Sequence, residues 1–173
     1  MLDERHRTRK FPLKKPTDFL LKGLVFGTDG RAYSPWLSSL RNNRRYAYYV
    51  PQSKIAGGAA SSDLPRCPAG ELETVVIQHL RSQLRSPASL LEHFPQSLLR
   101  HPRFDEAAVL ALLTNLDSVW DMLFYDARRG LVQTLIQRVT VGADKLSISL
   151  DMDGISRVVL DMLKGIPLKT SVT

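Results

Sequence analysis

The chain has 173 residues, of which 43% are hydrophobic, so it is long and apolar enough to bury a core in one ordinary domain or two small ones. It contains no run of about 18 apolar residues and no apolar segment of signal-peptide type, so we expect no membrane-spanning helix and a cytoplasmic location. The single cysteine, Cys67, excludes an internal disulfide framework and a zinc site built from cysteines.

Positive charge is concentrated in the first third of the chain. Residues 1–54 contain twelve Lys or Arg against four acidic residues, a net charge of +8, whereas residues 55–173 carry −1. The aromatic residues of this basic third include Tyr33, Trp36, Tyr46, Tyr48 and Tyr49. Basic residues mixed with aromatic ones favour a polyanion as the partner over a small acidic ligand. A solvated surface without a partner explains a basic cluster equally well, so both interpretations stay open.

Residues 22–51 predict a small antiparallel ribbon. Their short apolar and aromatic runs are separated by turn residues at 27–30 and at 41–44. Pro35 lacks a backbone donor, so its run belongs to an edge strand or is broken by a bulge. Residues 1–17 precede the ribbon and read as a basic arm, in which Lys14 and Lys15 are candidates for contact with phosphates.

The middle of the chain has a helical period. Residues 52–68 are rich in Gly, Ala, Ser and Pro and predict a loop, after which the spacing of Leu and Val predicts a helix over 69–85. Three prolines leave space for at most one short helix around 88–94. The apolar pattern then returns over 105–125, with Asp105 as N-cap and a break near Asp117. A further helix over 127–138 follows, capped by Asp126.

The end of the chain changes to a period of two. Residues 139–141 and 146–150 alternate between apolar and polar, which predicts a β-hairpin with one buried face, followed by a helix over about 153–164. A lone hairpin is marginal in water, so we expect it to pack on the ribbon or on the helices. The fold class is therefore α+β: a small antiparallel β-ribbon, an inserted helical segment and a returning β-hairpin.

The chain contains no recognisable catalytic or metal-binding motif, and we expect neither an enzyme nor a cofactor. His79 has no second histidine or acid at a metal-binding offset, which favours a structural histidine. Asp151 and Asp153 are better explained as a cap of the last helix than as a cation site, because no full oxygen-ligand loop follows them. No histidine is implied near Cys67 that would activate its thiol.

Three motifs carry a resemblance to a known family. In chain order they are KGLVF with GRAYSP and RRYAYYVP, then CPAGELETVVIQHL, and finally RRGLVQTLIQRVTVGADKLSISL. They resemble the C-terminal part of large serine recombinases, over about residues 20–163. After the basic arm (1–17), the resemblance implies a zinc-ribbon-like β domain (18–66), a helical, coiled-coil-like insertion (67–138), and a returning hairpin with a C-terminal helix (139–173). In that family the region recognises attachment-site DNA, and the insertion mediates contacts between bound subunits.

Two departures from the family pattern are clear. Zinc-bearing members have C-G-x-C-G where this chain has Phe26-Gly27-Thr28-Asp29-Gly30, and a further ligand position falls on Pro51. The chain therefore resembles a zinc-free form of the domain, in which we expect Phe26 to replace a ligand by packing. Nothing in the chain corresponds to the resolvase-like catalytic domain of the family, so the resemblance implies DNA recognition without strand cleavage.

The ribbon fits the major groove of B-DNA, which is about 12 Å wide. The residues predicted to contact DNA are Arg31, Arg41, Asn43, Arg44, Arg45, Tyr49 and Lys54, with Lys14 and Lys15 in the arm. Asn42 and Asn43 serve equally well as residues of a tight turn. Because alternate residues share a face, we expect Tyr46, Tyr48 and Val50 to pack in the core and the face of Arg45 and Tyr49 to meet DNA.

The predicted partners are double-stranded DNA and, through the helical insertion, a second copy or a recombinase subunit, in a nucleoid-associated cytoplasmic protein with no membrane contact. The alternative is a helical protein–protein interaction module with no DNA role. A steep decrease of DNA affinity with salt would distinguish the first interpretation from the second.

Overall fold

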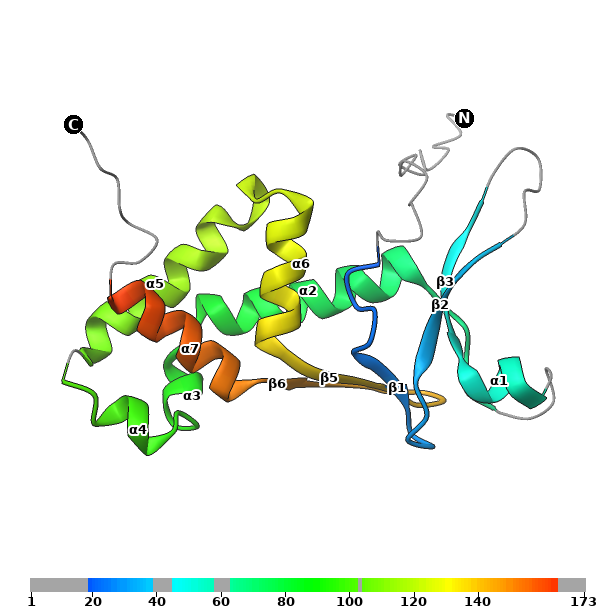
Figure 1. Cartoon of the computed structure of the whole chain (residues 1–173), viewed down its shortest axis with the longest axis horizontal. Helices are drawn as coiled ribbons and strands as arrows, with labels where there is room; N and C mark the ends of the chain where they lie inside the picture. The colour runs from blue at the N-terminus through cyan, green and yellow to red at the C-terminus, as the bar shows by residue number, and fades with distance from the viewer. Residues whose placement is uncertain (1–18, 39–44, 58–62, 103, 165–173) are drawn as a thin grey trace, which may run out of the picture.

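The computed structural model describes residues 19–38, 45–57, 63–102 and 104–164, and it has a mixed α+β architecture, as predicted. Two three-stranded sheets and a group of helices make up this part of the chain. In Figure 1 the helices α3, α4, α5 and α7 lie toward one end and the β2–β3 ribbon projects at the other, while α2 runs across the middle of the molecule and reaches the ribbon.

The first sheet joins the two ends of the described chain. Strand β1 (Val25–Gly27) runs parallel to β5 (Ile136–Val141), which forms an antiparallel hairpin with β6 (Leu146–Leu150). The predicted returning hairpin is therefore confirmed. The strand order is β1-β5-β6, so the hairpin pairs with β1, the first strand of the segment 22–51 in which the ribbon was predicted, and not with β2 or β3.

The second sheet has the order β2-β3-β4 and contains the ribbon. Strands β2 (Tyr33–Leu37) and β3 (Ala47–Pro51) are antiparallel, and the two-residue β4 (Cys67–Pro68) adds to the other side of β3. Pro35 of β2 lies opposite Tyr49 of β3. Because proline has no backbone N–H to donate, we predicted an edge strand or a bulge for it, and β2 is an edge strand of this sheet. Helix α1 (Gln52–Gly57) follows β3 directly, where the composition of residues 52–68 predicts a loop. That prediction is wrong for the first six residues of the segment.

The helical part begins with α2 (Ala69–Arg85), whose bounds match the prediction from its apolar stripe. Two short helices, α3 (Ala88–Leu91) and α4 (Gln96–Leu99), occupy the segment for which at most one was expected. Each follows a proline at its N-cap position, so Pro87 and Pro95 begin helices there.

Helix α5 (Glu106–Val119) packs along α2, and both contribute leucines to the core. Asp105 caps it as predicted, accepting a hydrogen bond of 3.0 Å from the backbone N–H of Ala107. The expected break follows at η1 (Trp120–Met122), a single 3₁₀ turn whose Trp120 is buried.

Helix α6 (Tyr125–Leu135) begins two residues earlier and ends three residues earlier than predicted, and its N-cap is Phe124 and not Asp126. It ends because Ile136 and the residues after it enter the β5–β6 ladder, in which Ile136 pairs with Leu150. The last helix, α7 (Met152–Leu163), is capped by the Asp151 carboxylate, which accepts from the Gly154 N–H at 2.8 Å. Asp151 is thus the helix cap that the sequence favoured.

One hydrophobic core runs through the helices and both sheets. At the edge of the core, a charged cluster joins α2 to α5: Arg81 and Arg85 of α2 both donate hydrogen bonds to the carboxylate of Asp117 on α5. Burial alone raises the pKa of Asp117, but the hydrogen bonds from the two guanidinium groups outweigh it and hold the pKa below its usual value. Among the described residues, no helix is long and apolar enough to cross a membrane.

Candidate nucleic-acid interface

The base of the ribbon is built by a tight turn between β1 and β2. The Gly30 N–H donates to the Gly27 carbonyl at 3.0 Å, and Gly30 takes a φ of +80°, which favours glycine. The Asp29 carboxylate accepts from the Arg31 N–H at 3.0 Å and completes the turn. The predicted turn at residues 27–30 is confirmed, and it leaves Arg31 exposed at the start of the ribbon.

The two faces of the ribbon differ from the prediction, although Val50 is buried, with 4% exposure, as expected. Tyr33 is 2% exposed and Tyr49 is 0% exposed, so the face of the odd-numbered residues packs on the core. Tyr46, which we expected in the core, is 50% exposed. The predicted contact of Tyr49 with DNA is therefore wrong, because the side chain lies inside the protein.

The reason for this choice of face is a buried hydrogen-bond network centred on Tyr49. Its hydroxyl donates to Oε1 of the buried Glu73 on α2 at 2.9 Å and accepts from the Leu21 N–H at 3.0 Å. Glu73 Oε1 also accepts from the Leu20 N–H at 3.1 Å. Burial, with the nearby charge of Glu73 as a second cause, raises the pKa of Tyr49 far above its ordinary value. The network fastens the ribbon to α2 and to the segment that precedes β1.

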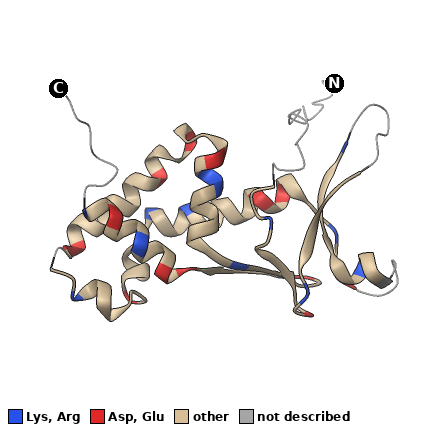
Figure 2. Ribbon diagram, in the orientation of Figure 1, with Lys and Arg blue, Asp and Glu red and all other residues tan. Residues whose placement is uncertain are grey.

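The predicted cationic contacts lie at both ends of the ribbon. Arg31, just before β2, and Lys54, just after β3, lie at the base of the ribbon. The exposed Arg45 precedes β3 near the far end of the ribbon. Within the described ranges, these three residues form no ion pair with a carboxylate, and β2 and β3 contain no acidic residue (Figure 2). Five predicted contacts lie outside the described residues: Lys14, Lys15, Arg41, Asn43 and Arg44.

Sequence reasoning did not select Trp36, although the structure makes it a prominent residue of the open face. Trp36 is 49% exposed and lies directly opposite Tyr48, and Tyr46 follows on the same face two residues from Tyr48. Alternation within each strand groups Trp36 with its own face of β2, but only the register between the two strands shows that Trp36 lies beside Tyr48.

Two of the solved structures to which the chain shows similarity are as follows. One is described as "Sequence Requirements of the Listeria innocua prophage attP site"; it has 13% sequence identity and a TM-score of 0.47 and covers 79% of this chain and 45% of that chain. The other is described as "Crystal Structure of a LSR-DNA Complex"; it has 15% identity and a TM-score of 0.47 and covers 80% and 53%. The chain spans about half the length of both.

No protein-family model and no curated protein matches the chain. Similarity at these identities and TM-scores assigns no family or function.

Phe26, which we expected to replace a zinc ligand by packing, forms a cation–π contact. The guanidinium carbon of Arg138 on β5 lies 4.0 Å from the ring centroid of Phe26 on β1. Such a cation–π pair contributes about 0.5–1 kcal/mol at an exposed site and more when it is desolvated. In the described part of the chain, no three His, Cys, Asp or Glu side chains gather as a metal site would require. Burial raises the pKa of the Cys67 thiol.

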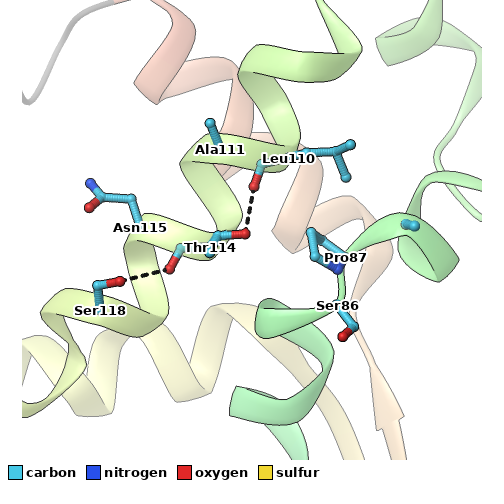
Figure 3. A pocket seen from close by; sticks show the side chains of 8 residues that line it. Ser86, Pro87, Leu110, Ala111, Thr114, Asn115 and Ser118 are labelled. Carbon is cyan, nitrogen blue, oxygen red and sulfur yellow. Dashed lines mark hydrogen bonds between the residues drawn. The ribbon is translucent and has the colours of Figure 1, made fainter.

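A shallow hollow of about 680 Å³ lies elsewhere, between α5 and the connection of α2 to α3 (Figure 3). Its Thr114 and Ser118 hydroxyls donate to carbonyls of their own helix at 2.9 and 3.2 Å. These two hydroxyl donors are therefore already used within α5.

Proposed function

We propose that this chain binds double-stranded DNA through its β2–β3 ribbon, as the DNA-recognising part of a protein of the serine-recombinase type, and that it contributes binding and not catalysis. The observation that supports the proposal is the pair of exposed arginines, Arg31 and Arg45, on a projecting ribbon whose described strands carry no carboxylate. Guanidinium groups in that position are available for phosphates and for guanine edges.

Fluorescence anisotropy of a labelled duplex, titrated between about 50 and 200 mM salt, tests the proposal, because each neutralised phosphate contributes about −0.9 to the slope of log K against log salt. We expect Arg31→Ala with Arg45→Ala to weaken binding and to flatten the slope by about 2. The matched control is Arg100→Ala, which removes an exposed arginine next to α4, at the opposite end of the molecule in Figure 1.

A slope near zero for the unmodified chain would favour the alternative, a helical interaction module without a DNA role. Equal effects of the ribbon and control variants would reject the ribbon as the contact surface. Recognition of a recombination site is the more specific part of the proposal. Selection from a pool of random duplexes should then enrich one sequence motif, and a pool that stays random would limit the chain to non-specific binding.

We also propose that the ribbon is held without a metal, with the Phe26–Arg138 contact where zinc-bearing relatives have a ligand. Elemental analysis of the purified chain should find less than one zinc per molecule, and treatment with a chelator should leave its melting temperature unchanged. One bound zinc per molecule would refute this part of the proposal.

Self-association through the helical part is a second candidate role, supported by two exposed apolar side chains. Met122 is 73% exposed and Phe124 is 87% exposed, and both lie at the corner between α5 and α6. We expect Met122→Ser with Phe124→Ser to abolish any concentration-dependent increase in sedimentation coefficient. Val75→Ser on α2, where the valine is 49% exposed, should leave it unchanged.

A further inference from the structure

The open face of the ribbon is unusual because it keeps aromatic rings in water. Trp36 and Tyr46 are each about half exposed, whereas the second tryptophan, Trp120, is 2% exposed. Tyr48 lies between them, directly across from Trp36 on β3, and Tyr46 immediately precedes that strand. Single exposed apolar side chains are common on protein surfaces, but three neighbouring rings on one face of a projecting ribbon form a patch.

The spacing of these rings suits flat ligands. Residues two apart on an antiparallel strand are separated by about 6.8 Å, which is twice the rise of about 3.4 Å between stacked bases. One planar base therefore fits between the side chains of Tyr46 and Tyr48. Trp36 offers a further ring surface from the opposite strand, at the distance of a direct cross-strand pair.

The charge around the patch selects the kind of flat ligand. Arg45 immediately precedes Tyr46, and the described residues 19–57 contain four basic residues against one acidic residue. This balance favours an anionic chain over an apolar peptide. Aromatic rings beside positive charge are the combination by which proteins hold single strands: the rings stack on the bases, and the charges follow the phosphates.

We propose that Trp36, Tyr48 and Tyr46 form a stacking platform for unpaired bases, so that the ribbon binds single-stranded or locally opened DNA through base faces. The inference rests on the proposed DNA-binding function and deepens it. In a closed duplex the base faces are hidden in the stack, and only edges and phosphates are presented. The platform therefore recognises a feature of DNA that the arginines alone do not distinguish.

Tryptophan fluorescence of the full chain tests the platform, because Trp36 reports on the open face while the buried Trp120 supplies a constant background. The probes are a thymidine oligomer of about 12 nucleotides, an oligomer of the same length made of abasic nucleotides, and a duplex of that length. We expect the thymidine oligomer to quench Trp36. The abasic oligomer, which has the same phosphates without bases, should leave its emission unchanged.

Variants of the platform should separate stacking from charge. Trp36→Ala and Tyr46→Ala are each expected to weaken binding of the thymidine oligomer roughly tenfold, the effect of losing one stacked base. Trp36→Phe keeps a ring and should retain most of the affinity. Val75→Ala removes an equally exposed apolar side chain from α2 and should have no effect. Far-UV circular dichroism and a thermal melt of each variant verify that it is folded.

The outcomes distinguish this inference from the function on which it rests. If the duplex binds with a steep salt dependence but the thymidine and abasic oligomers bind equally well, the platform is refuted and duplex binding stands. If none of the three probes binds with a salt dependence, the proposed DNA-binding function fails together with the platform. Quenching by both oligomers would place Trp36 near phosphates and would also overturn base stacking.

Discussion

Replacing Tyr49 by phenylalanine tests the claim that one buried hydroxyl determines which face of the ribbon packs inward. The substitution keeps the ring, whose edge-to-face contact with Phe19 has a centroid distance of 5.4 Å, and removes only the hydroxyl. Two hydrogen bonds disappear with it: the bond donated to Glu73 at 2.9 Å and the bond accepted from Leu21 at 3.0 Å. The change therefore isolates the polar part of the contact from its packing.

The expected cost follows from these two bonds. A hydrogen bond to a charged group contributes about 1.5–3 kcal/mol, and a buried N–H left without a partner costs about 1–3 kcal/mol. Because the contributions of one network do not add fully, we expect Tyr49→Phe to lower the free energy of unfolding by about 3 kcal/mol. For a chain of this size the melting temperature should decrease by about 6–12 °C.

Urea unfolding followed by far-UV circular dichroism measures this loss, and an unchanged m-value would show that the unfolded state is the same. The matched control is Tyr48→Phe. It removes a hydroxyl from the neighbouring tyrosine, which lies on the open face opposite Trp36. A loss for Tyr49→Phe within about 0.5 kcal/mol, the range of ordinary surface changes, would refute the network as the determinant of the face.

Three further changes follow from groups described above. Burial raises the pKa of both Tyr33 and Tyr49, so above about pH 10 the unfolded chain releases two protons that the folded chain keeps. The free energy of unfolding should therefore decrease by about 1.4 kcal/mol per pH unit for each tyrosine. Asp117→Asn weakens the bonds from two arginines and should cost about 2 kcal/mol at neutral pH. Its lowered pKa stabilises the fold above about pH 4, and this contribution is lost as the pH decreases through the folded-state value. Gly154→Ala should destabilise by about 1–3 kcal/mol, because a Cβ at Gly154 meets the backbone carbonyl oxygen of Thr134.

Each of these has a direct check in unfolding curves. The alkaline slope should decrease by about half in Tyr49→Phe, and an unchanged slope would contradict the assignment. In Asp117→Asn the loss of stability in acid should be smaller than in the unmodified chain. Gly130→Ala in α6 is the control for Gly154→Ala: a Cβ there meets nothing within 4 Å, so alanine should stabilise the helix by up to about 1 kcal/mol. Equal effects at the two glycines would contradict the close approach of α7 to α6.

The parts of the fold that the sequence predicts best are those with a local signal. Helix α2 has a clean apolar stripe and its bounds were predicted, and the Asp105 cap follows from residue type alone. Helix α1 was missed because the glycines and serines that follow it led us to predict a loop for the whole segment 52–68, although Gln52, Lys54 and Ala56 within it are compatible with a helix. The end of α6 was misplaced because Ile136 continues the apolar period of the helix, whereas its pairing with Leu150 of β6 makes it the first residue of a strand.

The candidate site shows the same division. Alternation along β3 predicted one packed and one open face, but the adjacent Tyr49 and Val50 are both buried, and alternation carries no information about which face packs inward. That choice depends on Glu73, which lies on another element and bonds to Tyr49 only after the chain has folded. A tyrosine that reaches a distant carboxylate looks, in one sequence, the same as a tyrosine that faces solvent.

The parallel pairing of β1 with β5 has a consequence for the way the protein is made. Val25 aligns with Val139, more than a hundred residues later in the chain, so the sheet beneath the ribbon cannot close until most of the polypeptide has left the ribosome. Long-range pairings of this kind slow folding, because loop closure precedes any gain from contacts. During synthesis, β1 therefore has no partner strand until the β5–β6 hairpin has been made.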